Sequence, residues 1–338
     1  MRGEDLSRLL GRTRDARGPA GGGRMIIICG DSLIDFLPSR SEDGGQDAYI
    51  PVPGGSCRNI AVGLGRLGSA AGFMGGISTD FFGDLIVSSM QVSGVSMQYV
   101  ARLDNATTLA FVKLGDGEPE YAFFDEASAS RCWTLAASPP LADDVTALHV
   151  GSLGLISPPV ADECLALMRE QKGRRVLCVD PNCRPTLTSD LATYRARLAE
   201  ALALADIIKL SRADLDYLIP GADPETIAAE WLAAGTSLVI VTKGGDGATA
   251  WVKGGRIDVP VGETVVVDTV GAGDSFIAAV LCHLDRTGLL HPGRIAAIDP
   301  SQAEAALQFA VRVAAFTCGR AGSNPPWAAE LQESATPV

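Results

Sequence analysis

The stretch Asp268-Thr269-Val270-Gly271-Ala272-Gly273-Asp274-Ser275-Phe276 is the strongest indication of fold and chemistry in this chain. An alternating-to-apolar run, Glu263–Val267, precedes it, and an apolar stretch, Ile277–Leu281, follows it. This order predicts a strand, a glycine turn and a helix whose first turn carries the carboxylate of Asp274. Free N–H groups at a helix N-terminus bind anions. A carboxylate beside such an anion can take a proton from an attacking nucleophile, so the stretch suggests phosphoryl transfer.

Outward from this stretch, short apolar runs alternate with helical patterns. The strand candidates are Met25–Gly30, Ala147–Val150, Val176–Val179, Asp206–Lys209 and Leu238–Thr242. The helical patterns are Val160–Gln171, Leu191–Leu204, Asp223–Ala234, Asp274–Arg286 and Pro300–Thr317. This alternation is typical of βαβ units. We therefore predict one α/β domain over residues 25–330, with a mostly parallel central sheet and helices on both faces.

Two segments depart from this pattern, at about residues 33–52 and 100–124, where apolar and polar residues alternate. The second contains a hairpin turn signal, Gly115-Asp116-Gly117-Glu118-Pro119. We predict that both segments supply strands of a small inserted sheet that acts as a lid. A second copy of the chain could pair with its exposed edges, which predicts a homodimer through the lid sheet.

Composition narrows the class of protein. Of 338 residues, 47% are apolar and 20% are charged, which is enough apolar material for a large core. The net charge is −12 and no dense Lys/Arg run follows the N-terminus, which argues against a nucleic-acid surface. No apolar run reaches the roughly 18 residues of a membrane span.

Residues 1–24 contain six arginines and lack the apolar core of a secretory signal. We expect a disordered extension there, with an Arg-rich organelle-targeting peptide as the alternative. The eight cysteines form no C-x-x-C pair and there are three histidines, a pattern that disfavours zinc and disulfides. Cysteines scattered within apolar runs are typical of core residues in the reducing cytoplasm.

Several nucleotide-binding motifs are absent or misplaced. Gly63-Leu64-Gly65-Arg66-Leu67-Gly68 matches G-x-G-x-x-G, but a dinucleotide motif must follow a strand and open a helix. Here the motif follows Arg58–Val62, which we interpret as a helix already under way, so its glycines are close-packing or C-cap positions. Walker A and the protein-kinase signatures do not occur, so phosphoryl transfer requires another scaffold.

A second glycine turn, Pro53–Asn59, points to a ligand with hydroxyl groups. Its two glycines let a ligand approach the backbone, and Asn59 offers both a donor and an acceptor. The alternative is an ordinary turn with a helix cap. Asp35 follows the first strand candidate, at the sheet edge where ligands of open α/β sheets bind.

Two long motifs make the chain resemble the ribokinase-like (PfkB-type) sugar kinases over about residues 25–326. The first runs from Gly54 to Gly68 and continues to Phe82-Gly83-Asp84, and the second is the opening stretch. The supporting segments are Asp180–Pro185, Lys209–Asp214 and Val241–Gly247. The segment His149–Leu153, with Asp180–Pro185 and Lys209–Ser211, makes the chain most similar to fructokinases. The resemblance implies a ribokinase-like fold and transfer of the γ-phosphoryl group of ATP to a sugar hydroxyl.

The resemblance also implies roles for individual residues. Asp274 would be the catalytic base, and Gly271, Ala272 and Gly273 would hold the γ-phosphoryl group. The sugar-binding residues would be Asp35, Asp31, Gly54, Gly55 and Asn59. Arg184 would reach a substrate oxygen or a phosphate, or else form a structural ion pair.

For the nucleotide, the resemblance implies contacts with Lys209, Ser211, Asp214, Thr242, Gly244 and Gly247, and an adenine flanked by residues 315–323. Mg²⁺ would arrive with the ATP phosphates, largely through water. Asp268 and the carbonyl of Val270 match a monovalent-cation site, which makes potassium a candidate. Two departures from the family pattern, Ser211–Asp214 in place of Asn-x-x-Glu and the segment Gly319–Ser323, leave the Mg²⁺ contacts and potassium dependence open.

Fructose is the first substrate expected, and 2-keto-3-deoxygluconate, ribose and a nucleoside are the alternatives within the fold. A 2-keto acid would favour an arginine on a lid strand, and Arg102 and Lys113 are the basic residues of the segment at 100–124. Two other classes are a sugar-binding protein without catalysis and an oxidoreductase that uses a dinucleotide. The second depends only on the misplaced glycine motif.

Overall fold

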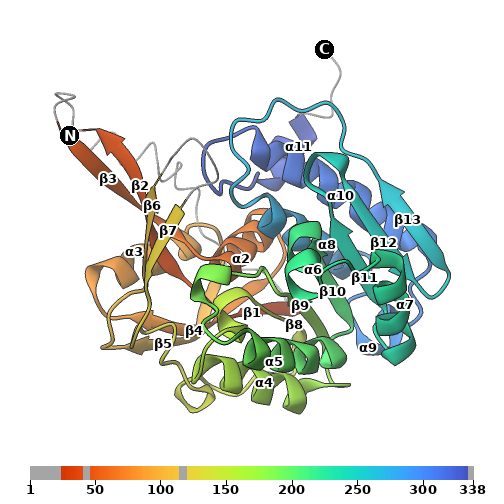
Figure 1. The fold of residues 1–338 in the computed structure, drawn as a ribbon, viewed down its shortest axis with the longest axis horizontal. Helices are drawn as coiled ribbons and strands as arrows, with labels where there is room; N and C mark the ends of the chain where they lie inside the picture. The colour runs from red at the N-terminus through yellow and green to blue at the C-terminus, as the bar shows by residue number, and fades with distance from the viewer. Residues whose placement is uncertain (1–23, 41–45, 114–119, 334–338) are drawn as a thin grey trace.

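The computed structural model describes residues 24–40, 46–113 and 120–333, and Figure 1 shows their arrangement. A large sheet has the strand order β13-β12-β11-β10-β9-β8-β1-β4-β5. Its strands are β1 (Met25–Cys29), β4 (Ala71–Ser78), β5 (Ser96–Leu103), β8 (Val145–Gly151), β9 (Val176–Asp180), β10 (Ile207–Ser211), β11 (Leu238–Thr242), β12 (Ala248–Val252) and β13 (Gly255–Val259). The pairs are parallel except β11–β12 and β12–β13. The predicted mostly parallel sheet is confirmed.

Helices cover both faces of this sheet (Figure 1). They are α2 (Ser56–Arg66), α3 (Phe81–Gln91), α4 (Val160–Gln171), α5 (Leu191–Leu204), α6 (Arg212–Leu218), α7 (Pro224–Ala234), α8 (Ala272–Arg286), α9 (Pro292–Ile295), α10 (Pro300–Cys318) and α11 (Ala328–Glu333). Short 3₁₀ turns lie at Leu135–Ala137, Ser152–Leu155, Pro185–Leu187 and Gly244–Asp246. The five predicted helices are confirmed to within two residues at each end.

The first strand explains why the sheet strands are apolar throughout. Ile26 and Ile28 pack into the core cluster that holds α2, α8 and α10, whereas Ile27 and Cys29 pack into the cluster of α4 and α5. A strand buried on both faces reads as a continuous apolar run because successive side chains point to opposite faces. The predicted strands could be recognised for this reason.

A second, smaller sheet of order β3-β2-β6-β7 projects from one end of the molecule, at the left in Figure 1. Its strands are β2 (Leu33–Arg40), β3 (Asp47–Gly54), β6 (Leu109–Lys113) and β7 (Glu120–Phe124). The hairpin turn predicted at residues 115–119 lies outside the described residues, as do residues 1–23 of the expected extension.

The predicted start of the second lid segment is wrong. Residues 100–103 belong to β5, which pairs with β4 at the edge of the large sheet. An edge strand with one exposed face has the same period-2 pattern as a lid strand, so the alternation could not separate the two.

The strand predicted at Glu263–Val267 is also wrong. These residues form an irregular segment between β13 and α8, and the side chains of Val265, Val266 and Val267 are 82%, 61% and 61% exposed. The N–H groups of Val267 and Asp268 both donate to the carbonyl of Cys318, the last residue of α10. The valine run therefore borders α10 in place of a sheet neighbour.

The G-x-G-x-x-G motif begins inside α2, and the packing interpretation of its glycines is confirmed. A Cβ on Gly63 would lie 2.9 Å from the Cβ of Ala278 on α8, and one on Gly65 would lie 2.1 Å from the carbonyl oxygen of Ser93. Gly68, with φ +90°, ends the helix as a C-cap turn.

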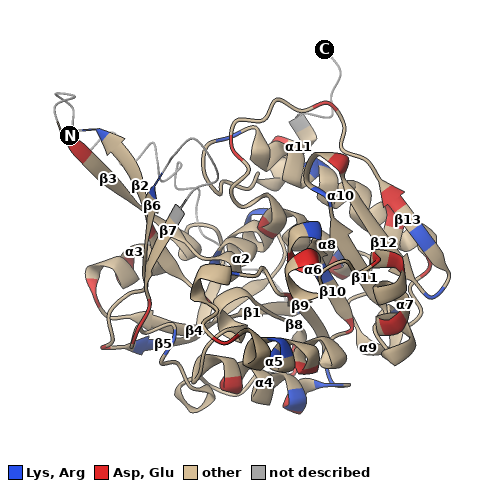
Figure 2. Ribbon diagram, viewed as in Figure 1, with Lys and Arg blue, Asp and Glu red and all other residues tan. Residues whose placement is uncertain are grey.

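The described part of the chain contains no helix with the length and apolar character needed to cross a membrane. In the view of Figure 2, basic and acidic residues are scattered over the helices and the outer strands, with both signs interspersed. The described residues on this face carry no continuous basic band of the kind that follows a nucleic-acid backbone.

Candidate active site

The N-terminus of α8 is built to receive an anion. Gly271, its N-cap residue, has φ +75°, and a Cβ there would lie 2.0 Å from the Oγ of Ser323. Only glycine fits this position. The N–H of Ala272 donates to the carbonyl of Thr269 at 3.2 Å. No side chain of the described residues caps this terminus, so the N–H groups of Gly273 and Asp274 on the first turn can donate to an anion bound there.

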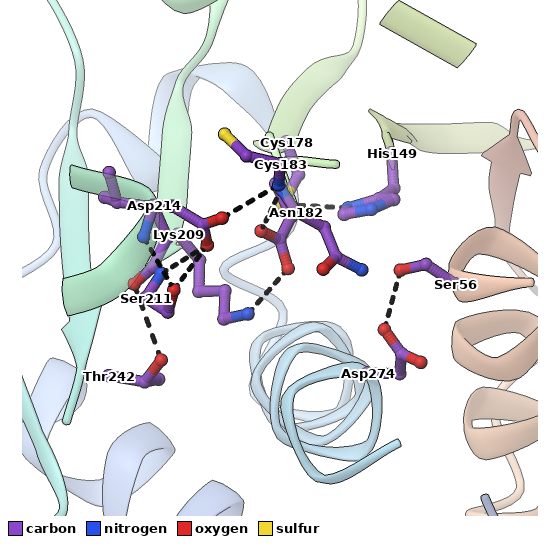
Figure 3. Close-up of polar contacts among 12 residues, drawn as sticks. Ser56, His149, Cys178, Asn182, Cys183, Lys209, Ser211, Asp214, Thr242 and Asp274 are labelled. Carbon is purple, nitrogen blue, oxygen red and sulfur yellow. Dashed lines mark hydrogen bonds and ion pairs between the residues drawn. The ribbon is translucent and has the colours of Figure 1, made fainter. Parts of the chain in front are cut away.

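Asp274 lies on this first turn, and both oxygens of its carboxylate accept hydrogen bonds from side chains of α2. The hydroxyl of Ser56 donates to Oδ1 at 2.6 Å, and the amide nitrogen of Asn59 donates to Oδ2 at 2.9 Å. Figure 3 shows Ser56 and Asp274 facing each other. The sequence prediction assigned Asn59 to the sugar site and did not single out Ser56, although Ser56 directly follows Gly55 within the predicted turn.

Asp31 and Asp35 lie against the glycine turn Pro53–Asn59, which leads into α2. The Asp31 carboxylate accepts the N–H groups of Ser56 at 2.9 Å and Cys57 at 3.4 Å, at the start of α2. Burial raises the pKa of Asp31. Burial, followed by the charge of Asp31, raises the pKa of Asp35 to about 6.

Both glycines of the turn are required by close contacts. A Cβ on Gly54 would lie 2.0 Å from Oδ2 of Asp35. Gly55 has φ +98°, and a Cβ there would lie 2.9 Å from the Cα of Ser32. The turn therefore packs its backbone against Asp31 and Asp35 and leads into the helix that carries Asn59.

The guanidinium of Arg184 forms hydrogen bonds with the two residues that precede it in the chain. Its NH1 donates to the side-chain oxygen of Asn182 at 2.7 Å and to the carbonyl oxygen of Cys183 at 3.0 Å. It forms no ion pair with the residues that the structure describes, although its positive charge lowers the pKa of Asp35 against the effect of burial. Arg184 was predicted either to reach a substrate or to form a structural ion pair. Among the described residues it has no carboxylate partner for such an ion pair.

A buried ion pair lies beside the helix terminus. The Nζ of Lys209 is 2.6 Å from Oδ2 of Asp180, and their side chains are only 5% and 1% exposed. Burial raises the pKa of Asp180 to about 6. Burial alone would lower the pKa of Lys209, but the Asp180 carboxylate outweighs it and raises that pKa, so the pair is ionised at neutral pH. Lys209 Nζ also lies 3.1 Å from where a Cβ of Gly273 would be.

Asp214 is tied to its own surroundings. With Ser211 it forms a capping box at the start of α6, in which Ser211 Oγ accepts the N–H of Asp214 at 3.0 Å and Oδ2 of Asp214 accepts the N–H of Ser211 at 2.9 Å. The Ser211 hydroxyl also donates to Oδ2 at 2.6 Å. Its Oδ1 accepts the N–H of Cys183 at 2.8 Å. Both carboxylate oxygens of Asp214 therefore already accept hydrogen bonds from the protein.

Thr242, Gly244 and Gly247 follow at the same sheet edge. Thr242 pairs with Ser211 in the register of β11 and β10. Gly244 and Gly247 have φ of +56° and +88°, and a Cβ on Gly247 would lie 2.1 Å from the carbonyl oxygen of Val259. The turn at Gly244–Gly247 therefore presents backbone, and no side chain from these two glycines, at the end of β11.

An open hollow lies between the segment after β13 and the end of α10. Val265, Ala315, Phe316, Gly319 and Arg320 line it. The guanidinium of Arg320 sits 4.3 Å from the ring centroid of Phe316 and pairs with Glu330 at 2.6 Å. The hollow includes part of the 315–323 region expected beside adenine.

Asp268 links the loop before α8 to the loop after α10. Its Oδ1 accepts the N–H of Val270 at 3.0 Å and its Oδ2 accepts the N–H of Gly322 at 2.8 Å. Within the described ranges, no group of three or more His, Cys, Asp or Glu side chains is placed to hold a metal ion. A cation here would depend on Asp268 together with backbone carbonyls.

Arg102 is not placed to act on a substrate carboxylate. It lies on β5 and donates to the Ser78 carbonyl at 2.8 Å and to Asp84 at 2.7 Å. Its guanidinium is therefore committed to the end of β4 and the first turn of α3, so Arg102 no longer favours a 2-keto acid.

Comparison with known proteins identifies close relatives of this arrangement. The family model "pfkB family carbohydrate kinase" matches residues 26–330. A fructokinase of Rhizobium leguminosarum bv. trifolii is 40% identical over 275 residues, which are 81% of this chain and 84% of that protein. Fructokinase-1 of Oryza sativa subsp. japonica is 30% identical and covers 93% of this chain and 97% of its own.

Solved structures agree. The fructokinase of Xylella fastidiosa with bound ATP superposes with a TM-score of 0.84 at 27% identity, over 93% of this chain and 99% of that one. The fructokinase of Vibrio cholerae O395, solved with fructose, ADP and calcium ion, has a TM-score of 0.80 at 24% identity over 93% and 99% of the two chains. At that identity the second likeness concerns the fold alone.

Proposed function

The chain belongs to the pfkB family of carbohydrate kinases, and from this we propose that it transfers the γ-phosphoryl group of ATP to a hydroxyl of fructose. The observation that carries the proposal is the position of Asp274. Its carboxylate lies on the first turn of α8, between the uncapped N-terminus of that helix and the donors Ser56 and Asn59 of α2.

The proposed reaction follows from this geometry. The N–H groups of Gly271 and Gly273 at this terminus hold the γ-phosphoryl oxygens and stabilise their charge, and Ala272 shapes the terminus through its own N–H, which donates to the carbonyl of Thr269. Asp274 accepts the proton of the sugar hydroxyl as its oxygen attacks phosphorus, and ADP leaves on the opposite side. Phosphoryl transfer needs mainly alignment and charge stabilisation, which a rigid helix terminus supplies.

The sugar would lie in the turn before α2. Asp35, the backbone at Gly54 and Gly55, and Asn59 offer acceptors and donors to its hydroxyls. Asp31 holds the start of α2 in place, so we assign it to shaping the sugar site, with direct contact as a secondary role. Arg184, which lacks a carboxylate partner among the described residues, is assigned to a substrate oxygen or a phosphate.

The nucleotide would extend from α8 toward the hollow beside α10. Lys209 supplies positive charge beside the phosphates, while Ser211, Asp214, Thr242, Gly244 and Gly247 line their path. Val265 and Phe316 would flank the base. Mg²⁺ would come with the phosphates, and Asp214 can accept its water ligands only through lone pairs that Ser211 and Cys183 leave free. The oxygens of Asp268 and Val270 suit a potassium ion.

We propose that residues 25–330 form one kinase domain and that the small sheet is its lid. Lid closure would exclude water from the transferring phosphoryl group. Ile50, Tyr121 and Phe124 on this sheet are 54%, 40% and 62% exposed, an apolar surface that a second copy could cover in a homodimer. We assign the enzyme to the cytoplasm.

A panel of substrates tests the proposed function. Fructose, ribose, 2-keto-3-deoxygluconate and a nucleoside are each incubated with ATP and Mg²⁺, with and without potassium, and ADP formation is measured. We expect fructose to give the highest kcat/KM. Higher kcat/KM with another member of the panel would replace fructose, and absence of turnover with all of them would refute the kinase.

The pKa of Asp35, about 6, predicts a pH dependence of sugar binding. Above this pH the carboxylate is ionised and accepts sugar hydroxyls, and below it the group is protonated and loses acceptor capacity. The KM for fructose is therefore expected to rise as the pH falls through about 6, while the KM for ATP changes little. Asp180 titrates in the same range but contacts Lys209. The Asp35→Asn variant separates the two, because its fructose KM should be high and independent of pH. A wild-type fructose KM that is flat across this range would contradict the assignment of Asp35.

Gly54→Ala provides a steric test of the sugar site. The added Cβ would fall 2.0 Å from Oδ2 of Asp35, so the carboxylate must rotate out of the site. Losing hydrogen bonds to a charged group is worth about 1.5–3 kcal/mol, so the fructose KM should rise roughly 10- to 100-fold while kcat changes less. Gly262→Ala is the matched control, because a Cβ there meets no atom within 4 Å. An unchanged fructose KM in Gly54→Ala would remove Asp35 from the sugar site.

A further inference from the structure

Arg58 carries a buried charge that the proposed chemistry does not yet use. The residue lies on α2 and is 6% exposed, and no carboxylate of the described residues forms an ion pair with it. Its NH1 donates to Oδ1 of Asn59 at 3.1 Å and its NH2 to the hydroxyl of Ser89 at 2.9 Å, while Nε has no partner. Burying a charge without an ion pair is unfavourable, so this arrangement calls for an explanation.

Asn59 lies between two groups of opposite hydrogen-bonding character. The guanidinium of Arg58 can only donate, and the ionised carboxylate of Asp274 can only accept. One orientation of the Asn59 amide satisfies both, with Oδ1 toward Arg58 and Nδ2 toward Oδ2 of Asp274. Without Arg58, nothing among the described residues donates to Oδ1, and the amide could rotate to offer either atom to an incoming sugar hydroxyl.

The charge of Arg58 persists at neutral pH. Burial, and next the charge of Arg66, lower the pKa of Arg58 to about 10, against the opposing effect of Asp35 and Asp274. Arg58 therefore acts as a charged donor, and hydrogen bonds from a charged donor are stronger than neutral ones.

We propose that Arg58 is a positioning residue for phosphoryl transfer, which acts on Asp274 through Asn59. By fixing the Asn59 amide it keeps one donor on Oδ2 of the base, while Ser56 holds Oδ1, so the carboxylate has one orientation before the sugar arrives. The inference rests on the proposed function of Asp274.

A purely structural role makes a different prediction. In that case Arg58 would serve to join α2 to α3 through Ser89, whose hydroxyl also donates to the Ile86 carbonyl at 2.6 Å. Ser89→Ala removes this tie and leaves the contact with Asn59 in place. It is the matched control for Arg58→Met, which removes the charge and both contacts but keeps an apolar stem of similar length.

The test compares kcat, both KM values and the melting temperature of these variants with fructose and ATP. Misplaced catalytic groups lose activity steeply, so we expect Arg58→Met to lower kcat roughly 10-fold with an unchanged KM for ATP and a melting temperature near that of the wild type. Ser89→Ala should retain kcat within about 2-fold, because Arg58 keeps its hydrogen bond to Asn59 in this variant. Equal losses in both variants, or a wild-type kcat in Arg58→Met, would overturn the proposal.

A double-mutant cycle tests the route through Asn59. In an Asn59→Ala background there is no amide to orient, so adding Arg58→Met should lower kcat no further. If the second substitution lowers kcat by the same factor as in the wild type, Arg58 does not act through Asn59. Arg58→Lys repeats the test with the charge retained: its ammonium lacks the planar fork, so part of kcat should be lost, and full kcat would contradict the proposal. Asp274→Asn in the same assay keeps the two hypotheses apart, because full activity there refutes the base itself.

Discussion

Asp274→Asn is expected to fold normally and to lose roughly 10²- to 10⁴-fold in kcat, the contribution typical of a positioned general base. The substitution keeps the shape of the side chain and removes its ability to take a proton. The Asn59 amide and the Ser56 hydroxyl, at 2.9 Å and 2.6 Å, would face one carbonyl oxygen and one amide nitrogen in place of two carboxylate oxygens. The measurement is steady-state turnover of fructose and ATP, with the melting temperature recorded in parallel.

The matched control for this variant is Asp285→Asn, on the same helix about three turns further along. It changes the charge equally and lies at the opposite end of α8 from the uncapped N-terminus. We expect its kcat to stay near that of the wild type. Turnover of Asp274→Asn at the rate of the control would exclude Asp274 as the base.

Lys209→Met is expected to be the most destabilising of the changes considered, with a loss of about 3–5 kcal/mol in the free energy of unfolding. The substitution leaves the carboxylate of Asp180, 1% exposed, without its partner at 2.6 Å. It also removes the positive charge beside Gly273, so activity should fall as well. Denaturant unfolding of both proteins measures the stability difference.

The loss should depend on pH in a defined direction. Burial already raises the pKa of Asp180 to about 6 in the wild type, above the ordinary value of about 3.9 for an unfolded chain. Removing Lys209 raises it further, so the folded variant binds a proton more tightly than its unfolded chain does. The stability difference from the wild type is therefore fully present above the raised pKa of Asp180 in the variant, and it shrinks as the pH falls toward and below about 6, where Asp180 becomes protonated in both folded proteins.

A second substitution provides the control. Lys209→Met combined with Asp180→Leu removes the stranded charge, so most of the lost stability should return. If the single variant is as stable as the wild type at neutral pH, or if the double variant is less stable still, the buried ion pair does not have the role assigned to it.

The sequence predicted those helices and strands whose signal lies within the segment itself. α5 and α7 begin after Asp190 and Asp223, whose side chains accept the N–H groups of the first turn, and this is a local cap signal. Strands such as β11, buried on both faces, read as unbroken apolar runs. The valines before Asp268 carried the same apolar signal without a neighbouring strand, so the prediction of a strand there was wrong.

The residues of the candidate site also fall into two groups, those that a local motif reveals and those that only the fold reveals. The two glycine turns and Asp274 could be predicted because each is a short motif with a chemical meaning of its own. Ser56, Arg58 and the Asp180–Lys209 pair acquire significance only through contacts made by the fold, such as the bond between Ser56 and Asp274, 218 positions apart. β4, with glycine at three of its positions in Ala71–Ser78, lacks the apolar run that revealed its neighbours.

The most direct test of the account is the product balance of one reaction. Fructose, ATP and Mg²⁺ are incubated with the wild type and with Asp274→Asn, and ADP and sugar monophosphate are both quantified by mass spectrometry. The account predicts equal amounts of ADP and fructose monophosphate from the wild type and almost none from the variant. ADP formed without sugar phosphate, or equal product from both proteins, would contradict it.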